Sequence, residues 1–169
     1  MKFRRKSKKK SSGLESLVNR GLMEATKPIF ENINKLMAYY RCAIMEVETK
    51  LNVLNEQFSL QYDRNPISSI QTRLKRMDSI SEKLAKDDLP MTLQSMEENL
   101  NDIAGVRVIC SFPEDVYMIA EALLSQDDIT LISKKDYIRE PKTNGYRSLH
   151  LIVTVPIFLA DEKRLMKVE

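Results

Sequence analysis

Apolar side chains recur every three or four residues from Ile29 to Phe58, and this stripe constrains the fold more than any other feature of the 169-residue chain. Such spacing places the side chains along one face of a helix. Pro28 stands at the start of the stripe, and proline is favoured in a first helical turn. The pattern therefore predicts a helix over residues 28–61 whose apolar face packs on the rest of the domain or on a second subunit.

A basic tail precedes this stripe. The first ten residues hold seven of the 27 Lys and Arg and no acidic residue, so the rest of the chain has 20 basic against 24 acidic side chains. Such a tail can bind RNA or an anionic surface. More commonly it is a disordered, solubilising end. We expect residues 1–27 to be a disordered tail, with RNA contact as an alternative.

The segment after residue 62 alternates between polar and apolar residues and then resembles a helix start. Residues 67–75 predict a strand whose outer face carries Arg73 and Lys75. Asp78 or Ser79 can cap the following helix, and Glu82, three residues beyond Ser79, gives the spacing of a capping box. A helix N-terminus attracts anions. Lys83 follows one turn on. These cations could surround a phosphate chain; the alternative is a solvated strand face and an ordinary cap.

The remaining segments alternate irregularly between helix and strand patterns. They predict helices over residues 92–101 and 113–126, and strands near 102–112, 128–134, 149–155 and 164–169. Residues 108–110 are apolar and β-branched, as in a buried central strand. This order predicts an α+β fold with a mixed β-sheet of about five strands flanked by helices.

Only two glycines follow residue 21, and each lies in a charged motif at a strand. Gly105 stands between Asp102 and Arg107, and a charge within a buried strand is costly unless it has a partner or a task. Gly145 lies in the polar loop 135–150, which ends at the only histidine, His150. A strand glycine can mark the close approach of a ligand. The coincidence favours a functional role for both motifs.

The second motif has the residues of a nucleotide site. Its Asn-Gly pair signals a turn, after which Tyr146, Ser148 and His150 occupy alternate positions and project from one face. A tyrosine can stack on a base, while Lys142 and Arg147 can meet phosphates. The alternative is a solvated hairpin whose tyrosine covers the core.

Several function classes lack their motifs. The chain has no GxxxxGK[ST] loop, no GxGxxG and no nucleophile elbow, and one His without a Cys cluster argues against zinc. No apolar run reaches the roughly 18 residues of a membrane span, and no secretory signal is apparent. Cys42 and Cys110 are expected to be free thiols of a reducing compartment. The surplus of Arg, Lys, Tyr and Ser suits phosphoryl-type transfer around Mg²⁺.

Three motifs resemble those of the RelA/SpoT-type (p)ppGpp synthetase domain. The two signature motifs resemble Asp102-Ile103-Ala104-Gly105-Val106-Arg107 and Asp136-Tyr137-Ile138…Pro141-Lys142…Asn144-Gly145-Tyr146-Arg147-Ser148-Leu149-His150. The family's ATP-binding motif resembles Arg73-x-Lys75-x-x-x-Ser79. The motifs occur in the family's order, the resemblance covers residues 62–169, and the size is similar to that of small, single-domain alarmone synthetases.

The resemblance implies a nucleotidyltransferase-like, cytoplasmic enzyme that transfers pyrophosphate from ATP to the 3′-hydroxyl of GDP or GTP. The products are AMP and (p)ppGpp, the alarmone of the stringent response. The resemblance also implies Mg²⁺ and a homo-oligomer, with no membrane partner. The residues carried over are Asp102, Glu169 and His150 for catalysis; Asp102 and Glu169 for the metal; Arg73, Lys75, Ser79, Lys83 and Arg107 for ATP; and Tyr146, Lys142, Asn144 and Ser148 for GDP or GTP.

The end of the sequence departs from the family pattern. Family members continue with a strand motif of the form Glu-[Val/Ile]-Gln-Ile-Arg-Thr and then a helix, whereas here Glu169 aligns with the first Glu of that motif. We therefore expect residues 62–169 to be a C-terminally incomplete synthetase domain. The alternative is a catalytically incomplete nucleotide-binding or regulatory protein of the same fold.

Overall fold

The computed structural model describes residues 8–62 and 64–169, with side chains described at residue 24, from 26 to 61 and from 64 onward. The chain divides into two compact units, residues 1–36 and 37–169. Most of the predicted basic tail, with any RNA contact it makes, lies outside the described side chains. No helix among the described residues is long and apolar enough to cross a membrane.

The first helix, α1 (Lys8–Tyr62), begins earlier than predicted, so Pro28 lies inside it. The expectation of a helix starting at residue 28 is therefore wrong. Residues 22–25, just before Pro28, are Leu-Met-Glu-Ala, all strong helix formers, and these propensities favour helix on the N-terminal side of the proline.

Within the second unit, α1 buries the predicted apolar stripe. Its most deeply buried side chains there are Tyr40, Ala43, Val47 and Leu51. Complete burial of one large apolar side chain contributes about 1.5–3 kcal/mol. The apolar face of this part of α1 therefore belongs to the core of the second unit.

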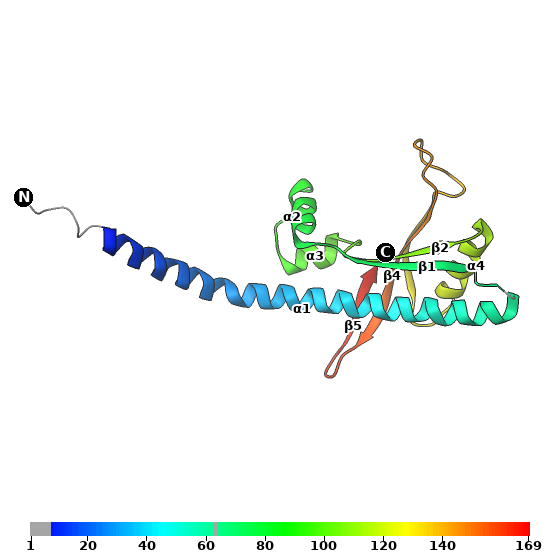
Figure 1. Cartoon of the computed structure of the whole chain (residues 1–169), viewed down its shortest axis with the longest axis horizontal. Helices are drawn as coiled ribbons and strands as arrows, with labels where there is room; N and C mark the ends of the chain where they lie inside the picture. Colours follow the sequence, from blue (N-terminus) through cyan, green and yellow to red (C-terminus); the bar gives the residue numbers. More distant parts are fainter. Residues whose placement is uncertain (1–7, 63) are drawn as a thin grey trace, which may run out of the picture. The chain divides into compact units, whose positions relative to one another are not determined.

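Five strands form two hydrogen-bonded sheets (Figure 1). Strands β1 (Ile67–Leu74) and β2 (Ala104–Cys110) pair antiparallel, and β3 (Thr130–Asp136), β4 (Leu149–Phe158) and β5 (Lys163–Val168) form an antiparallel set in the order β3-β4-β5. The two sets meet where the Val106 N–H donates to the Glu169 carbonyl at 2.8 Å and the Glu169 N–H donates to the Ala104 carbonyl at 2.9 Å. This is a single parallel bridge between Gly105 and Glu169, just after β5, and it places β2 beside β5, so that the two sheets lie edge to edge. The predicted α+β fold of about five strands is confirmed.

Three shorter helices, α2 (Met77–Lys86), α3 (Leu93–Asn99) and α4 (Pro113–Leu124), complete the unit. The predicted capping box is wrong. The N-cap of α2 is Arg76, no side chain caps the helix, and the Ile80 N–H already donates to the Arg76 carbonyl at 3.0 Å. Burial of Ile80 and Leu84 fixes this register. Ser79 still lies in the first turn.

The expectation of a buried strand at residues 108–110 is also wrong in part. Ile109 is 41% exposed, although β2 lies between β1 and β5. Side chains alternate across a strand, and in β2 Arg107 and Ile109 on one side are exposed, while Val106, Val108 and Cys110 on the other side are half-buried. A place between two strands therefore does not bury both faces of β2.

An ion pair between the buried Asp115 and the partly exposed Arg64 lies at the start of α4. Asp115 is only 2% exposed, and its two carboxylate oxygens accept hydrogen bonds from the Arg64 guanidinium at 2.6 and 2.7 Å. These hydrogen bonds hold the pKa of Asp115 below its usual value, against the effect of burial. The carboxylate therefore stabilises the fold above the pKa of an unpaired Asp, about 3.9, and this contribution is lost as the pH falls through the lowered folded-state pKa.

We expect Arg64→Met to lower the free energy of unfolding at pH 7 by about 2 kcal/mol, because it leaves a buried carboxylate without its partner. The acid dependence of stability below about pH 4 should become shallower. Urea unfolding at a series of pH values measures both effects. Arg76→Met, at an exposed arginine paired with exposed Asp78, is the matched control. An Arg64→Met variant as stable and as acid-sensitive as wild type would contradict this assignment.

Candidate nucleotide and metal site

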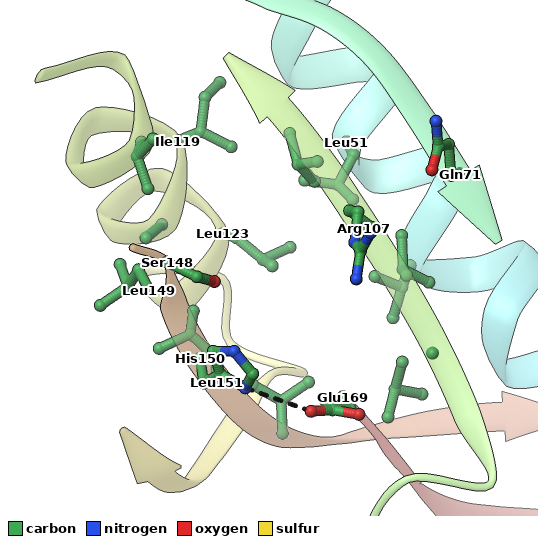
Figure 2. Close-up of a pocket in the computed structure, with 18 of the residues that line it drawn as sticks. Leu51, Gln71, Arg107, Ile119, Leu123, Ser148, Leu149, His150, Leu151 and Glu169 are labelled. Carbon is green, nitrogen blue, oxygen red and sulfur yellow. Dashed lines mark ion pairs between the residues drawn. The ribbon is translucent and has the colours of Figure 1, made fainter. Parts of the chain in front are cut away.

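One cavity of about 480 Å³ lies between β2 and β4 in the second unit (Figure 2). Its apolar wall includes Leu51 of α1, and Ile119 and Leu123 of α4. Polar and ionisable side chains line the remainder: Gln71, Thr72, Arg73, Arg107, Cys110, Tyr146, Ser148, His150 and Glu169. Six of these nine residues belong to motifs on which the sequence prediction rests, and the exceptions are Gln71, Thr72 and Cys110.

The register of β1 against β2 places two arginines together. Arg73 pairs with Gly105 and Gln71 pairs with Arg107, so both guanidinium groups project from the same face as diagonal neighbours. Both side chains are exposed, and neither makes an ion pair with another described residue. Two unpaired planar cations on one face can stack on the two sides of a flat ring.

The loop between β3 and β4 holds the predicted turn. Gly145 has φ +81°, a left-handed conformation that suits glycine. The Asn144 side chain accepts a hydrogen bond from the Tyr146 N–H at 3.1 Å, and the Gly145 N–H donates to the Lys142 carbonyl at 2.8 Å. Asn144 therefore shapes the turn that presents Tyr146.

The aromatic side chains and His150 form a cluster beside the cavity. Tyr146 makes edge contacts with Tyr137 and His150, with ring centroids 6.3 and 5.8 Å away. The ammonium of Lys142 lies 4.5 Å from the centroid of Tyr137 and 5.3 Å from that of Tyr146. The cluster thus offers an aromatic surface with a cation beside it, which suits a base joined to phosphates.

His150 connects this cluster to Glu169. The Tyr146 hydroxyl lies 2.9 Å from His150 Nε2, and His150 Nδ1 lies 3.2 Å from Glu169 Oε1 (Figure 2). The Glu169 backbone is fixed by its hydrogen bonds to β2. The imidazole is therefore held between a phenol and a carboxylate.

Two long side chains of β5 fasten that strand to α3. Arg164 bonds to the Glu97 carboxylate, and the Lys167 ammonium donates to the Glu97 and Glu98 carbonyls at 2.8 and 3.0 Å. A cation is favourable at the C-terminal end of a helix. These contacts hold β5, which leads directly to Glu169.

A second charged group lies where β1 ends and β2 begins. Asp102 accepts hydrogen bonds from Lys75 at 2.7 Å and from Lys83 at 2.9 Å. Burial opposes the charged form of Asp102, but the two lysines outweigh it and hold the pKa of the carboxyl below its usual value. Ser79 lies in the first turn of α2, the helix that carries Lys83.

The structure separates the predicted residues into three groups. Lys75 and Lys83 each contact Asp102, and neither these three residues nor Ser79 line the cavity. Lys142 and Asn144 belong to the loop that carries Tyr146. The third group lines the cavity: Arg73, Arg107, Tyr146, Ser148, His150 and Glu169.

Sequence reasoning assigned no role to three residues that shape the loop. Asp136 accepts hydrogen bonds from the Tyr117 hydroxyl, at 3.0 and 3.1 Å, and from the backbone N–H groups of Ile138 and Arg139. Burial opposes the charge of Asp136, but these donors outweigh it and keep its pKa low. Tyr137 packs against His150 with centroids 5.4 Å apart. Two of these three residues, Asp136 and Tyr137, stand at the start of the second motif, which was a signal in the sequence.

Residues 72–169 match a protein-family model described as a region found in RelA / SpoT proteins. The chain belongs to the RelA/SpoT family. The family resemblance of the motifs is therefore confirmed. The match includes both charged motifs and the whole of the proposed ATP motif, which begins at Arg73.

Two relatives of this RelA/SpoT protein come from Bacillus subtilis (strain 168). It is 36% identical over 147 residues to the GTP pyrophosphokinase YwaC, covering 87% of this chain and 70% of the relative. It is 33% identical over 135 residues to the GTP pyrophosphokinase YjbM, covering 80% of this chain and 63% of the relative. The chain thus spans about two thirds of the length of these relatives.

Comparison with solved structures gives the same family assignment. The structure resembles small alarmone synthetase 1 from Bacillus subtilis bound to its product pppGpp, with a TM-score of 0.73 and 32% identity over 82% of this chain and 70% of the other. It also resembles the same enzyme bound to AMPCPP, with a TM-score of 0.67, 28% identity, and coverage of 82% and 68%. The fold of the RelA/SpoT protein is therefore that of a small alarmone synthetase.

Proposed function

We propose that this RelA/SpoT protein is a GTP pyrophosphokinase that transfers pyrophosphate from ATP to the 3′-hydroxyl of GDP or GTP, giving AMP and (p)ppGpp. The observation that carries the proposal is the arrangement around the cavity. Two exposed arginines lie on β1 and β2, an aromatic cluster with His150 lies on the β4 side, and Glu169 follows β5 and contacts His150. A group of two lysines and Asp102 completes the arrangement. Two nucleotide sites of different character suit a reaction between two nucleotides.

Each set of residues has a role in this proposal. Arg73 and Arg107 stack on the adenine of ATP, and Lys75, Lys83 and Ser79 bind its phosphates. The Tyr146 ring stacks on the guanine. Lys142, Asn144 and Ser148 surround the acceptor nucleotide, with Lys142 supplying charge and Asn144 holding the turn. His150 and Glu169 lie near the attacking 3′-hydroxyl, and most of the catalysis is positioning and charge neutralisation.

The residues present fit Mg²⁺. Among the described residues, no group of three or more His, Cys, Asp or Glu side chains could hold a metal ion unaided. Mg²⁺ is commonly bound by one or two carboxylates with substrate phosphates and water. Asp102 and Glu169 would supply these carboxylates in the complex. The bound cation would neutralise charge on the transferred phosphates.

The proposal extends to assembly and location. α1 carries exposed Met45, Val53 and Leu60 at spacings of eight and seven residues, so they share one face of the helix. We propose that this face contributes to a homo-oligomer in the bacterial cytoplasm. Light scattering of the purified protein measures the assembly, and a strictly monomeric protein would contradict it.

Chromatography of a reaction mixture tests the proposed activity. The protein is incubated with ATP, Mg²⁺ and either GDP or GTP, and the nucleotides are separated. AMP should appear only when the guanine nucleotide is present, together with a more highly phosphorylated guanosine. Binding of both nucleotides without AMP formation would favour the alternative of a nucleotide-binding or regulatory protein of the same fold.

A further inference from the structure

Both oxygens of Asp102 are already occupied by cations of the chain itself. Oδ2 accepts from Lys75 at 2.7 Å, and Oδ1 accepts from Lys83 at 2.9 Å. The fold fixes both lysines. The backbone N–H of Lys75 donates to the Ile103 carbonyl at 2.8 Å. Lys83 lies on α2, whose Ile80 and Leu84 are buried. The contact is therefore built into the second unit.

The net positive charge of Asp102, Lys75 and Lys83 together disfavours the binding of a free metal ion. One carboxylate faces two ammonium groups, so the group carries a net positive charge. The side chains are 21% exposed for Asp102, 15% for Lys75 and 38% for Lys83, so solvent screens them only in part. A divalent cation that approached either oxygen would meet an ammonium at contact distance. Coulomb repulsion at such distances is large near a protein surface.

The same two ammonium groups are the ones that the proposed function assigns to the triphosphate of ATP. A polyphosphate carries several negative charges and attracts both lysines more strongly than one carboxylate does. Lysines that turn to phosphate oxygens release the oxygens of Asp102. The arriving phosphates also reverse the sign of the local charge, which favours a divalent cation.

We propose that Lys75 and Lys83 couple metal binding at Asp102 to the binding of a nucleoside triphosphate. In the free protein they exclude a divalent cation from the carboxylate, and in the complex they release it. The inference rests on the proposed function for the identity of the phosphate ligand. Because coupling between two ligands is reciprocal, the metal also strengthens triphosphate binding by the same factor.

Manganese titration of the free protein tests the exclusion, with free Mn²⁺ followed by electron paramagnetic resonance. Lys83→Met removes one ammonium while keeping much of the apolar stem, and the free variant should bind Mn²⁺ about tenfold or more tightly than wild type. The gain should disappear in the double variant Lys83→Met/Asp102→Asn. Lys86→Met, on the same helix and exposed, is the matched control and should resemble wild type.

The coupling itself is measured by repeating the titration with AMPCPP, after correction for Mn²⁺ bound to free AMPCPP. AMPCPP should raise the Mn²⁺ affinity of wild type more than that of Lys83→Met. Lys75→Met provides a second test if Lys83→Met does not fold. Equal Mn²⁺ affinity of the free wild type and the lysine variants, or a gain that survives Asp102→Asn, would overturn the coupling. If AMP formation were normal despite that result, only the coupling would be wrong and the proposed function would still hold.

Discussion

Asp102→Asn should reduce pyrophosphate transfer by about a thousandfold, because a catalytic metal contributes several kcal/mol of charge stabilisation and needs an anionic ligand. Asparagine keeps the shape of the side chain and can still accept one hydrogen bond from a lysine. Asp102 is surface-accessible in part and lies outside the apolar core, so the free energy of unfolding should change little. AMP formation and urea unfolding of the variant measure the two effects.

Asp87→Asn provides the matched control. Asp87 is an exposed carboxylate at the C-cap of α2, close in sequence to Lys83 but without contact to Asp102. Its activity should equal that of wild type. An Asp102→Asn protein with wild-type turnover would remove Asp102 from the metal role.

The second large effect concerns Tyr146. Tyr146→Ala should weaken the binding of GDP or GTP by about 1–3 kcal/mol, because it removes a stacking surface for the base. ATP affinity should remain nearly unchanged, since Arg73 and Arg107 lie on the other strands of the site. Calorimetric titration with each nucleotide separately measures the two affinities.

Tyr146→Phe separates the ring from its hydroxyl. It keeps the stacking surface and loses only the contact with His150 at 2.9 Å. Guanine-nucleotide affinity should therefore be retained in the Phe variant and lost in the Ala variant. Equal losses for ATP and GDP in Tyr146→Ala would show that Tyr146 is not the guanine platform.

The sequence predicted the fold class well because its local signals agree with the final packing. The apolar spacing from Tyr40 to Leu54 predicted the buried face of α1, and the alternation of residues 67–75 predicted β1. The signals failed where tertiary contacts decide the outcome. Burial of Ile80 moved the start of α2 ahead of Ser79, and the exposed side of β2 left Ile109 in solvent.

The sequence motifs predicted which residue types form the site, but not how those residues contact one another. The spacing of Arg73, Lys75 and Asp102 gives residue types for a phosphate and metal site, but it cannot show that the carboxylate and the lysines are in contact. That contact depends on the β1–β2 register, in which Leu74 faces Ala104. Likewise, the position of Glu169 beside His150 depends on the parallel contact between β5 and β2, which has no signature in the sequence.

The fate of a label in the β-phosphate of ATP tests the central claim most directly. The protein is incubated with β-labelled ATP, GDP and Mg²⁺, and the label is followed through separation of the nucleotides. If the chain transfers pyrophosphate, the label should move to a 3′-pyrophosphorylated guanosine in equal amount to the AMP formed, and the AMP should be unlabelled. Label that stays in ATP or ADP, or is released as free phosphate, would contradict the account.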